Sequence, residues 1–189
     1  RAVTGEEISH EDLGGAAAHC GKSGVAHFRF ASEAECMEFL RRFLTYLPSN
    51  NMEGPPVVDT GDPVDRRTER LSELLPEEER QVYDVKEFIG EVADRDSFIE
   101  VQPDYAQNVV VGFARLGGRT VGFFANQPKV YAAALDVNGS DKAARFLRFC
   151  DSFHIPIVTL VDVPGFLPGV AQEHGGIIRH GAKMLYAYS

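Results

Sequence analysis

The sequence predicts a layered α/β fold, and three features carry that prediction. Two helical segments each begin with a capping-box pattern, at residues 32–35 and 84–87. Two runs rich in β-branched and aromatic residues, 109–115 and 119–125, flank a Gly-Gly turn as in a β-hairpin. A further apolar run, 157–163, follows a helical segment. Helices that alternate with buried strands indicate a sheet covered by helices, with right-handed crossovers.

The N-terminal quarter is expected to hold irregular segments and one helix. Residues 1–30 are rich in Gly, His and Ala without a clear period, which indicates loops around short elements. A helix is predicted to begin after Ser32, which caps it, and to continue until Pro48. Its apolar residues recur at helical spacing, and they are Cys36, Leu40, Phe43 and Leu47.

A linker and a second helix follow. Residues 50–81 are rich in Pro, Asp, Gly, Arg and Glu, with only Leu71, Leu74 and Leu75 as an apolar anchor. That composition is typical of a linker. The helix that begins at Asp84 is expected to bury four apolar residues, namely Val85, Phe88, Ile89 and Val92.

The predicted sheet occupies the C-terminal half. A short strand at 98–101 precedes the hairpin, whose turn at Gly117 and Gly118 needs the left-handed dihedrals that glycine adopts. A helix is predicted at residues 141–153, capped by Ser140 or a neighbour.

Two elements close the chain. Residues 157–163 form a β-branched run of the kind found in strands covered on both faces. A last helix is predicted from Ile177 to Ser189, opened by Gly175 and Gly176. Because that helix stops without a C-cap signal, the chain is expected to be a fragment.

Composition bounds the kinds of partner. In 189 residues, 19 Lys and Arg stand against 28 Asp and Glu, which gives a formal charge of -9. Nucleic acid is therefore not an expected partner, although an anionic small molecule is. Three distant cysteines fit reduced thiols better than a disulfide framework. No apolar run reaches the ~20 residues of a membrane span and no targeting segment is visible, so the expected location is cytoplasmic, or the mitochondrial matrix in a eukaryote.

A candidate ligand loop follows the last strand. Residues 164–169 lie just past the carboxyl end of that strand, where open α/β sheets bind ligands. Gly175 and Gly176 then open a helix, and glycine lets a ligand oxygen approach the amides of a helix N-terminus. Such amides suit an oxyanion. The alternative is that these prolines and glycines only form a tight strand-to-helix turn.

No set of side chains has the spacing of a metal site. His19, Cys20 and His27 are not spaced as zinc ligands, and His174 and His180 lie on different faces of a helix. No metal is expected.

Other polar residues have ordinary explanations. Ser23 and Ser140 lack the frame of a serine nucleophile, which favours capping or loop roles. Asp162 is interpreted as a buried, hydrogen-bonded carboxylate that holds the loop rather than as an acid. The basic residues on helices are interpreted as solvated or ion-paired, and they are Arg145, Arg148, Arg179 and Lys183.

Long motifs at both ends of the chain resemble one known family. The N-terminal motifs are Ala2-Val3-Thr4-Gly5-Glu6, Leu13-Gly14-Gly15-Ala16 and Ser23-Gly24-Val25-Ala26-His27. The C-terminal motifs are Lys142-Ala143-Ala144-Arg145-Phe146, Val161-Asp162-Val163-Pro164-Gly165-Phe166-Leu167-Pro168-Gly169 and Gln172-Glu173-His174-Gly175-Gly176. Together they resemble the carboxyltransferase (β) subunit of biotin-dependent acyl-CoA carboxylases, of the propionyl-CoA carboxylase type.

The resemblance implies a fold and a division of the chain. The fold is a crotonase-like (ClpP/crotonase) layered βα superhelix, present in part. Residues 1–48 then correspond to the C-terminal tail of the acyl-CoA domain and residues 49–106 to a linker with short helices. Residues 107–189 correspond to the first half of the biotin-side domain. Two departures from the family, His154 in place of a more usual Asn and the run at 131–134, are expected to be unimportant.

The resemblance also implies an activity. A carboxyl group would move from carboxybiotin to the α-carbon of a short acyl-CoA, with propionyl-CoA giving methylmalonyl-CoA. Biotin would be carried on a separate domain or subunit, and a coenzyme A thioester would be the substrate. The implied partners are acyl-CoA, a biotinylated carrier or biotin carboxylase subunit, and further copies of the chain, as in the hexamer of relatives.

In the family, backbone N–H groups form two oxyanion holes, for the enolate and for the ureido oxygen of biotin. The resemblance places the Gly-Gly-Ala segments that supply the principal donors before Arg1 and after Ser189, so no catalytic residue is assigned. The resemblance assigns the biotin side of the site to Gly165, Phe166, Leu167, Pro168, Gly169, Gly175 and Gly176.

Three alternatives stay open. The same subunit type serves the reverse reaction, in which a malonyl-type thioester is decarboxylated onto biotin. A non-catalytic module that binds acyl-CoA or the biotin domain would keep the fold without turnover. A crotonase-type hydratase or isomerase needs an acid or base pair, and the sequence offers no convincing one.

Overall fold

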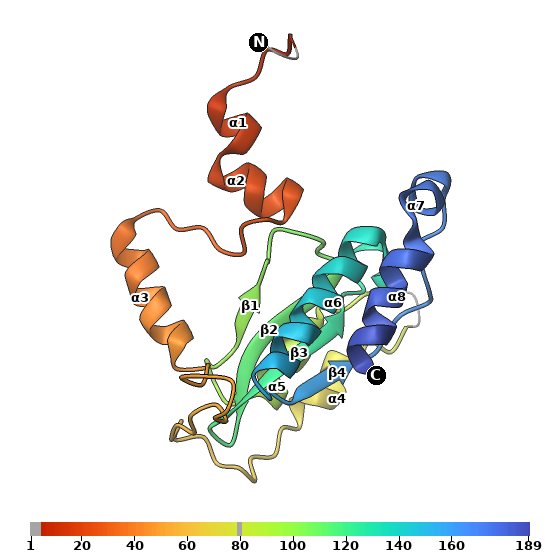
Figure 1. Ribbon diagram of the computed structural model, residues 1–189. Coiled ribbons are helices and arrows are strands. Elements are labelled where there is room, and N and C mark those ends of the chain that lie inside the picture. Colours follow the sequence, from red (N-terminus) through yellow and green to blue (C-terminus); the bar gives the residue numbers. More distant parts are fainter. Residues whose placement is uncertain (1–4, 79–80) are drawn as a thin grey trace.

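A four-stranded sheet with helices on both faces forms the body of the computed structural model, which describes residues 5–78 and 81–189 (Figure 1). The strands are β1 (Ile99–Val101), β2 (Val109–Leu116), β3 (Arg119–Asn126) and β4 (Ile157–Leu160), in that spatial order. The first three run antiparallel, and β4 pairs with β3 in parallel. The α/β class predicted from the sequence is confirmed.

The helices fall into an N-terminal group and a group around the sheet. The first group holds α1 (His10–Gly14), α2 (Ala16–Ala18), the π-helical turn η1 (His19–Ser23) and α3 (Glu33–Leu44). The second holds α4 (Arg70–Leu74), α5 (Val85–Val92), the 3₁₀ turn η2 (Tyr131–Ala133), α6 (Val137–Ser152), α7 (Val170–Gly175) and α8 (Ile177–Tyr188). Within the described ranges, no helix combines the length and the apolar composition of a membrane span.

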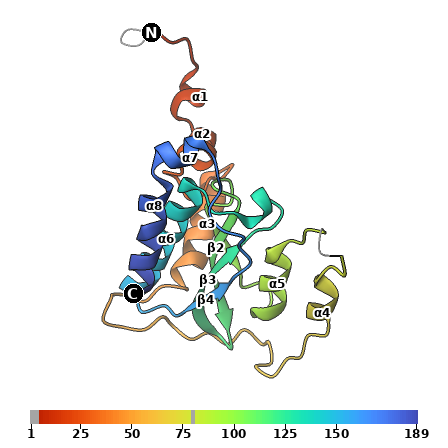
Figure 2. The same ribbon diagram turned by 90° about the vertical axis from the view of Figure 1, so that its right-hand side faces the viewer.

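Side chains alternate along the central hairpin between two hydrophobic cores. Val109, Val111 and Phe113 of β2 lie on the face that α6 and α8 cover. Val110 and Ala114 lie on the opposite face, against α5. Figure 2 shows the layers, with α8 and α6 on one side of the sheet and α5 and α4 on the other. Because both faces are covered, β2 reads as a continuous apolar run.

The turn between β2 and β3 is fastened by one carboxylate. Gly117 and Gly118 have φ angles of 55° and 75°, the left-handed pair that the Gly-Gly sequence predicts. Their amides donate to Asp94, at 2.9 and 2.7 Å respectively. Thr60 of the linker donates to the same carboxylate at 2.9 Å. Asp94 thereby joins the linker to the hairpin.

The predicted apolar face of helix α3 is confirmed at Phe43 and at Leu47 just beyond the helix, but not at Leu40. Ser32 caps it as expected, and the helix ends at Leu44 rather than at the predicted residue 47. Phe39 and Phe43 pack against the core, whereas Leu40 is 41% exposed. The prediction for Leu40 is wrong because two phenylalanine rings bury more apolar area than a leucine stripe does.

Helix α6 begins four residues before the predicted start at residue 141. Its N-cap is Asp136, whose side chain accepts a hydrogen bond from the amide of Gly139 at 2.7 Å. Ser140 is not the cap and lies fully buried inside the helix. Aspartate and serine cap helices equally well, so residue type alone could not separate the two positions.

Strand β4 is shorter and less covered than predicted. It ends at Leu160, its four residues are only half-buried, and Val161 is 73% exposed. The expectation of a strand buried on both faces is wrong here. Its neighbour on one side is β3, and among the described residues no strand pairs with the other edge.

The carboxylate of Asp94 makes stability depend on pH. Burial alone would raise the pKa of Asp94, but hydrogen bonds from Gly118, Gly117 and Thr60 outweigh that effect and lower it. A carboxyl whose pKa is lowered on folding stabilises the fold above its unfolded pKa. That contribution is lost as pH falls through the folded value.

We therefore expect Asp94→Asn to lower the free energy of unfolding by about 1 to 3 kcal/mol at pH 7. The difference from the parent should shrink as the pH is lowered toward 3, because the parent carboxylate becomes protonated. Urea denaturation followed by circular dichroism measures both values. Asp65→Asn removes the same charge from an exposed position and is the control. A difference that does not change with pH would contradict this account.

Candidate functional site

The carboxyl ends of β3 and β4 lie at the same edge of the sheet. The parallel register pairs Ala125 with Leu160, one residue before β3 ends and at the last residue of β4. The segments that leave these strands, residues 127–136 and 161–169, therefore start side by side. We call these two segments together with Gly175 and Gly176 the candidate site.

The predicted loop is held against the other segment by backbone hydrogen bonds. The Leu135 amide donates to the Gly165 carbonyl at 3.0 Å, and the Leu167 amide donates to the Leu135 carbonyl at 2.8 Å. Gly165 and Gly169 have φ angles of 146° and 134°. Residues other than glycine rarely adopt these φ angles, so the turn itself requires glycine at both positions.

The loop presents its apolar side chains outward. Phe166 is 46% exposed, and its ring lies over Gly181 of α8, where a Cβ would collide with it. Leu167 is half-buried, and Pro168 is exposed. At Gly165 nothing lies within 4 Å of the position that a Cβ would take.

Gly176 is the N-cap of the last helix, as predicted, and the residues before it form a short helix that ends at Gly175. Gly175 ends α7, and Gly176 has a φ of 82°, which separates α7 from α8. The Gly176 amide donates to the Glu173 carbonyl at 3.0 Å. The Gly176 amide itself is therefore not available to a ligand. Gln172 of α7 accepts a hydrogen bond from the Val137 amide at 2.9 Å and so ties α7 to the start of α6.

Buried amide side chains fix the segment that follows β3. Asn108, just before β2, donates from Nδ2 to the Ala134 carbonyl at 2.8 Å and to Oδ1 of Asp136 at 3.1 Å. Asn126 and Gln127 at the end of β3 are also buried. Buried polar groups that are hydrogen-bonded hold one backbone conformation, because leaving them unpaired is costly.

Asp162 holds the start of the predicted loop. Its amide donates to Oδ1 of Asn126 at 3.2 Å, and its carboxylate accepts from the Tyr83 hydroxyl at 2.6 Å. Burial, followed by the bond to Asp162, raises the pKa of Tyr83 to about 12. The interpretation of Asp162 as the residue that holds the loop agrees with these contacts, but its side chain is exposed and not buried as expected.

Sequence reasoning missed a strained turn within the candidate site. Tyr131, Ala132 and Ala133 form η2 with φ angles of 53°, 48° and 64°. His154 also has a left-handed backbone, with a φ of 53°. Such conformations cost about 1 to 3 kcal/mol for each non-glycine residue and gather at functional sites. The only signal that the sequence offers is the departure from the family at these positions.

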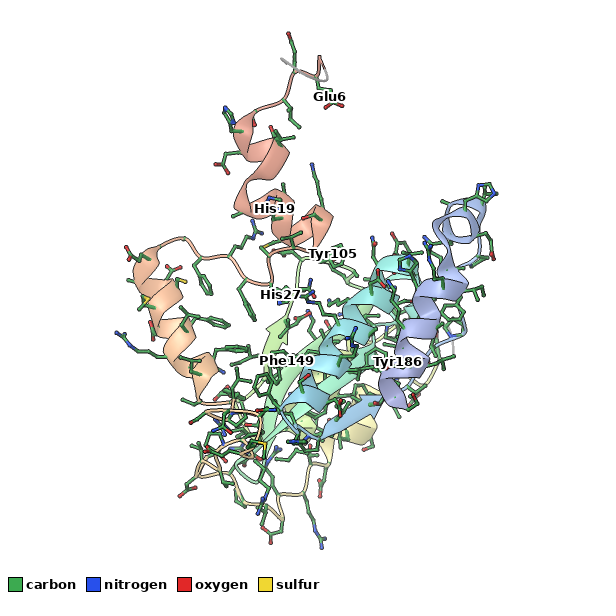
Figure 3. The ribbon with its side chains drawn as sticks, viewed as in Figure 1. Glu6, His19, His27, Tyr105, Phe149 and Tyr186 are labelled. Atoms are coloured by element: carbon green, nitrogen blue, oxygen red, sulfur yellow. The ribbon has the colours of Figure 1, made fainter. Side chains whose placement is uncertain are left out.

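A cavity of about 210 Å³ opens next to the strained turn. Gly21 and Lys22 of η1 form one wall, residues 104–108 form a second, and Tyr131 and Asp136 contribute to the third. Figure 3 labels Tyr105 in this region, below the His19 side chain of η1. The lining is polar and carries both signs of charge.

The remaining sequence candidates are spread over the molecule. His19 and Ser23 contact each other, with Nδ1 and Oγ 3.0 Å apart, at exposed positions. Burial, and then the charge of Arg145, lower the pKa of His27. Among the residues that the structure describes, no group of three or more His, Cys, Asp or Glu could hold a metal ion.

One of the basic candidates, Lys183, is paired across α6 and α8, together with His180. Asp141 accepts from Lys183 at 2.7 Å and lies 2.8 Å from Nδ1 of His180. Burial alone would raise the pKa of Asp141, but hydrogen bonds from Lys183 and His180 lower it. Arg179 lies over Gly176. The interpretation of Lys183 as ion-paired is confirmed.

Comparison with known proteins decides the family. Residues 1–189, the whole chain, match the family model of the carboxyl transferase domain. The chain belongs to the carboxyl transferase domain family. The residues at positions 1–4 and 79–80 share in this match, although they lie outside the described structure.

Curated relatives in this family include proteins that are 50% to 58% identical to the chain. They include the methylmalonyl-CoA decarboxylase subunit alpha of Veillonella parvula at 58% and the propionyl-CoA carboxylase carboxyltransferase subunit of Haloferax mediterranei at 53%. The mitochondrial propionyl-CoA carboxylase beta chain of Homo sapiens is 50% identical. Each match covers all of this chain but only 35% to 37% of the relative.

Solved structures of carboxyl transferases have the same fold. Transcarboxylase 12S, with methylmalonyl-coenzyme A and methylmalonic acid bound, superimposes with a TM-score of 0.95 at 50% identity. That match covers 99% of this chain and 36% of the other. A single-chain, multi-domain long-chain acyl-CoA carboxylase gives a TM-score of 0.82 at 26% identity, over 95% of this chain and 18% of the other. The crotonase-like fold that the resemblance implied is confirmed.

The amide network predicts a stability effect. Asn108→Ala should lower the free energy of unfolding by about 1 to 3 kcal/mol, because it removes the side-chain donor to the buried Ala134 carbonyl and one of the donors to the Asp136 carboxylate. Urea denaturation measures the change. Asn138 is exposed in the first turn of α6. Asn138→Ala is the control and should change the free energy of unfolding by less than about 0.5 kcal/mol. Equal losses in the two variants would show that the Asn108 contacts do not matter.

Proposed function

We propose that this chain is part of the carboxyltransferase component of a biotin-dependent acyl-CoA carboxylase. The reaction moves a carboxyl group from carboxybiotin to the α-carbon of a short acyl-CoA, and propionyl-CoA giving methylmalonyl-CoA is the proposed case. The observation that supports it most is the match of almost the whole chain to transcarboxylase 12S with methylmalonyl-coenzyme A bound. Two propionyl-CoA carboxylase subunits at 50% and 53% identity point to the same acyl group.

The seven predicted residues form the biotin side of the proposed site. Gly165, Phe166, Leu167, Pro168 and Gly169 lie past the carboxyl end of β4, and Gly175 and Gly176 lie at the junction of α7 and α8. The open backbone at Gly165 and Gly169, where no atom lies within 4 Å of the position that a Cβ would take, fits the approach of a flat ring. Carboxybiotin, when bound, supplies the carboxyl group.

The chain's own contribution in this proposal is electrostatic and geometric. The Asp162 carboxylate already accepts a hydrogen bond from the Tyr83 hydroxyl. The residues of the loop offer backbone groups and apolar surface to a ligand. Fixed backbone donors stabilise charge that develops in a transition state without reorganising, and one such donor contributes about 3 to 4 kcal/mol. The hydrogen bonds through Leu135 keep the loop in one position for that task.

The proposed division of the chain follows the family. Residues 1–48 are the tail of the acyl-CoA domain, residues 49–106 are the linker, and residues 107–189 are the first half of the biotin-side domain. The proposed partners are an acyl-CoA, a biotinylated carrier or biotin carboxylase subunit, and further copies of the chain. Exposed apolar residues on α8, namely Ile178, Leu185 and Tyr186, support contact with other protein surfaces. The proposed location is the cytoplasm, or the mitochondrial matrix in a eukaryote.

A second candidate is the decarboxylase direction. The relative at 58% identity is a methylmalonyl-CoA decarboxylase subunit. In this case the carboxyl group leaves methylmalonyl-CoA and is received by biotin.

A carboxyl-transfer assay tests both candidates. Methylmalonyl-CoA or malonyl-CoA is supplied with biotin as acceptor, and propionyl-CoA and acetyl-CoA are followed by mass spectrometry. The assay uses the 189-residue chain and a carboxyltransferase of full family length that carries this sequence in place of its own matched segment. Propionyl-CoA formation by the full-length form supports the proposal. Binding of acyl-CoA without turnover by that form would favour a non-catalytic module.

The loop glycines predict a specific loss of turnover. In the full-length form, Gly169→Ala should lower kcat by about 10- to 100-fold, because a side chain at a φ of 134° displaces the loop. Gly90 of α5 has no atom within 4 Å of the position that a Cβ would take. Gly90→Ala is therefore the matched control, for which we expect unchanged kcat. Equal activity of the two variants would remove this loop from the proposed site.

A further inference from the structure

A buried lysine outside the proposed site organises a loop of carbonyl groups. Lys142 on α6 is 2% exposed. Its Nζ donates to the carbonyls of Tyr105 and Val109 at 2.7 Å each, and of Gln102 at 3.0 Å, with Ala106 at 3.4 Å. Its ammonium makes no ion pair with a carboxylate in the described ranges.

An unpaired charge in this position is costly. Moving an ammonium out of water carries a penalty of several kcal/mol, and an apolar side chain of similar volume often serves packing better. Burial lowers the pKa of Lys142 to about 8, against the charge of Glu100, so the protonated form still predominates at pH 7. Packing alone therefore does not explain a lysine here, and its N–H donors do.

The loop that surrounds the ammonium is one that needs such a donor. We call residues 102–109 the lysine loop. Gln102 and Ala106 in it have φ angles of 53° and 43°, which are unfavourable for non-glycine residues. Four carbonyl oxygens converge on one point, and they repel each other unless a cation or donor lies between them. The ammonium of Lys142 fills that place.

One end of the lysine loop holds the N-terminal arm, by which we mean residues 5–31. The Gln102 side chain donates from Nε2 to the Gly24 carbonyl at 2.6 Å, and the Gln102 backbone N–H donates to the His27 carbonyl at 3.2 Å. The Tyr105 ring packs against Gly24, where a Cβ would collide with it. In Figure 3, His27 and Tyr105 both lie where the arm meets the sheet.

The other end of the lysine loop holds the candidate site. Asn108 donates to the Ala134 carbonyl and to the Asp136 carboxylate. Leu135, between these two residues, makes the backbone hydrogen bonds with Gly165 and Leu167. Residues 104–108 also form one wall of the 210 Å³ cavity, between the arm and the strained turn η2. The lysine loop, which the Lys142 side chain holds, therefore contacts both the N-terminal arm and the candidate site.

We propose that Lys142 is a positioning residue whose ammonium fixes the lysine loop and, through it, the placement of the N-terminal arm relative to the candidate site. Its importance for carboxyl transfer rests on the proposed function, in which the arm belongs to the acyl-CoA domain and the site to the biotin-side domain. The coupling itself is a property of the fold.

Hydrogen exchange with chemical rescue tests the proposal on the 189-residue chain. Lys142→Ala removes three carbons and the nitrogen, the atoms that propylammonium can replace. Tetramethylammonium carries the same charge without N–H donors. Peptides covering residues 24–28, 102–109 and 134–138 report the coupled regions, and the β2–β3 turn, which Asp94 fastens, is the internal reference.

We expect exchange in the three coupled regions to rise by about tenfold in Lys142→Ala, with a much smaller change at the β2–β3 turn. Propylammonium should restore slow exchange, and tetramethylammonium should not. Unchanged exchange, a uniform rise over the whole chain, or equal restoration by both cations would overturn the proposal. Lys86→Ala, at a more exposed lysine paired with Glu100, is the control and should leave the three regions unchanged.

Loss of folding in Lys142→Ala is also informative. Recovery of the folded circular dichroism spectrum by propylammonium and not by tetramethylammonium would support the proposal, and failure of propylammonium to recover it would overturn it. Lys142→Met keeps the apolar stem without donors, and it should show the same pattern of exchange as Lys142→Ala. Because none of these measurements needs turnover, an inactive full-length form in the carboxyl-transfer assay would overturn the proposed function and leave this inference standing.

Discussion

Coverage of the β2–β3 hairpin on both faces is the constraint on which the rest of the structure depends. Phe113 and Phe123 are fully buried on opposite faces, so the chain must supply a helix to each face. Helix α6 covers one face and α5 the other, although they come from opposite sides of the hairpin in sequence. The linker is then drawn over the turn, where Asp94 meets Thr60.

The candidate site follows from that arrangement. Once α6 lies on the sheet, its first residues and the segment before them must sit at the carboxyl end of β3. Asn108 and Asp136 join there, and Leu135 pairs with the turn that follows β4. The site is therefore supported by buried hydrogen bonds from a rigid sheet rather than by the loop's own sequence. Such support suits a function that depends on fixed backbone groups.

The sequence predicted local structure well where one residue type has one physical role. The left-handed turn at Gly117 and Gly118 and the caps at Ser32 and Asp84 needed only local chemistry. Choices between equivalent groups were not predictable, and the cap of α6 is Asp136 rather than the predicted Ser140. The prediction that β4 is buried on both faces was wrong for another reason. Burial depends on neighbouring elements, which an apolar run in the sequence does not reveal.

Much of the candidate site escaped prediction on the same grounds. The position of the loop after β4 followed from strand order, whereas the contacts that hold it come from residues far away in the chain, such as Tyr83 and Asn126. The left-handed turn at Tyr131 to Ala133 carries no glycine or asparagine that would announce it. Long-range contacts impose that backbone, and residue preferences oppose it.

The two edges of the sheet differ in a way that matters for handling the protein. The outer strand β1 has only three residues, which gives a short template for another strand. At the other edge, β4 is only half-covered and is followed by the exposed Val161. Open apolar edges recruit further strands, and natural proteins blunt them with charges, prolines or a covering element. Among the described residues, β4 is therefore the edge that is more open to pairing with a further strand.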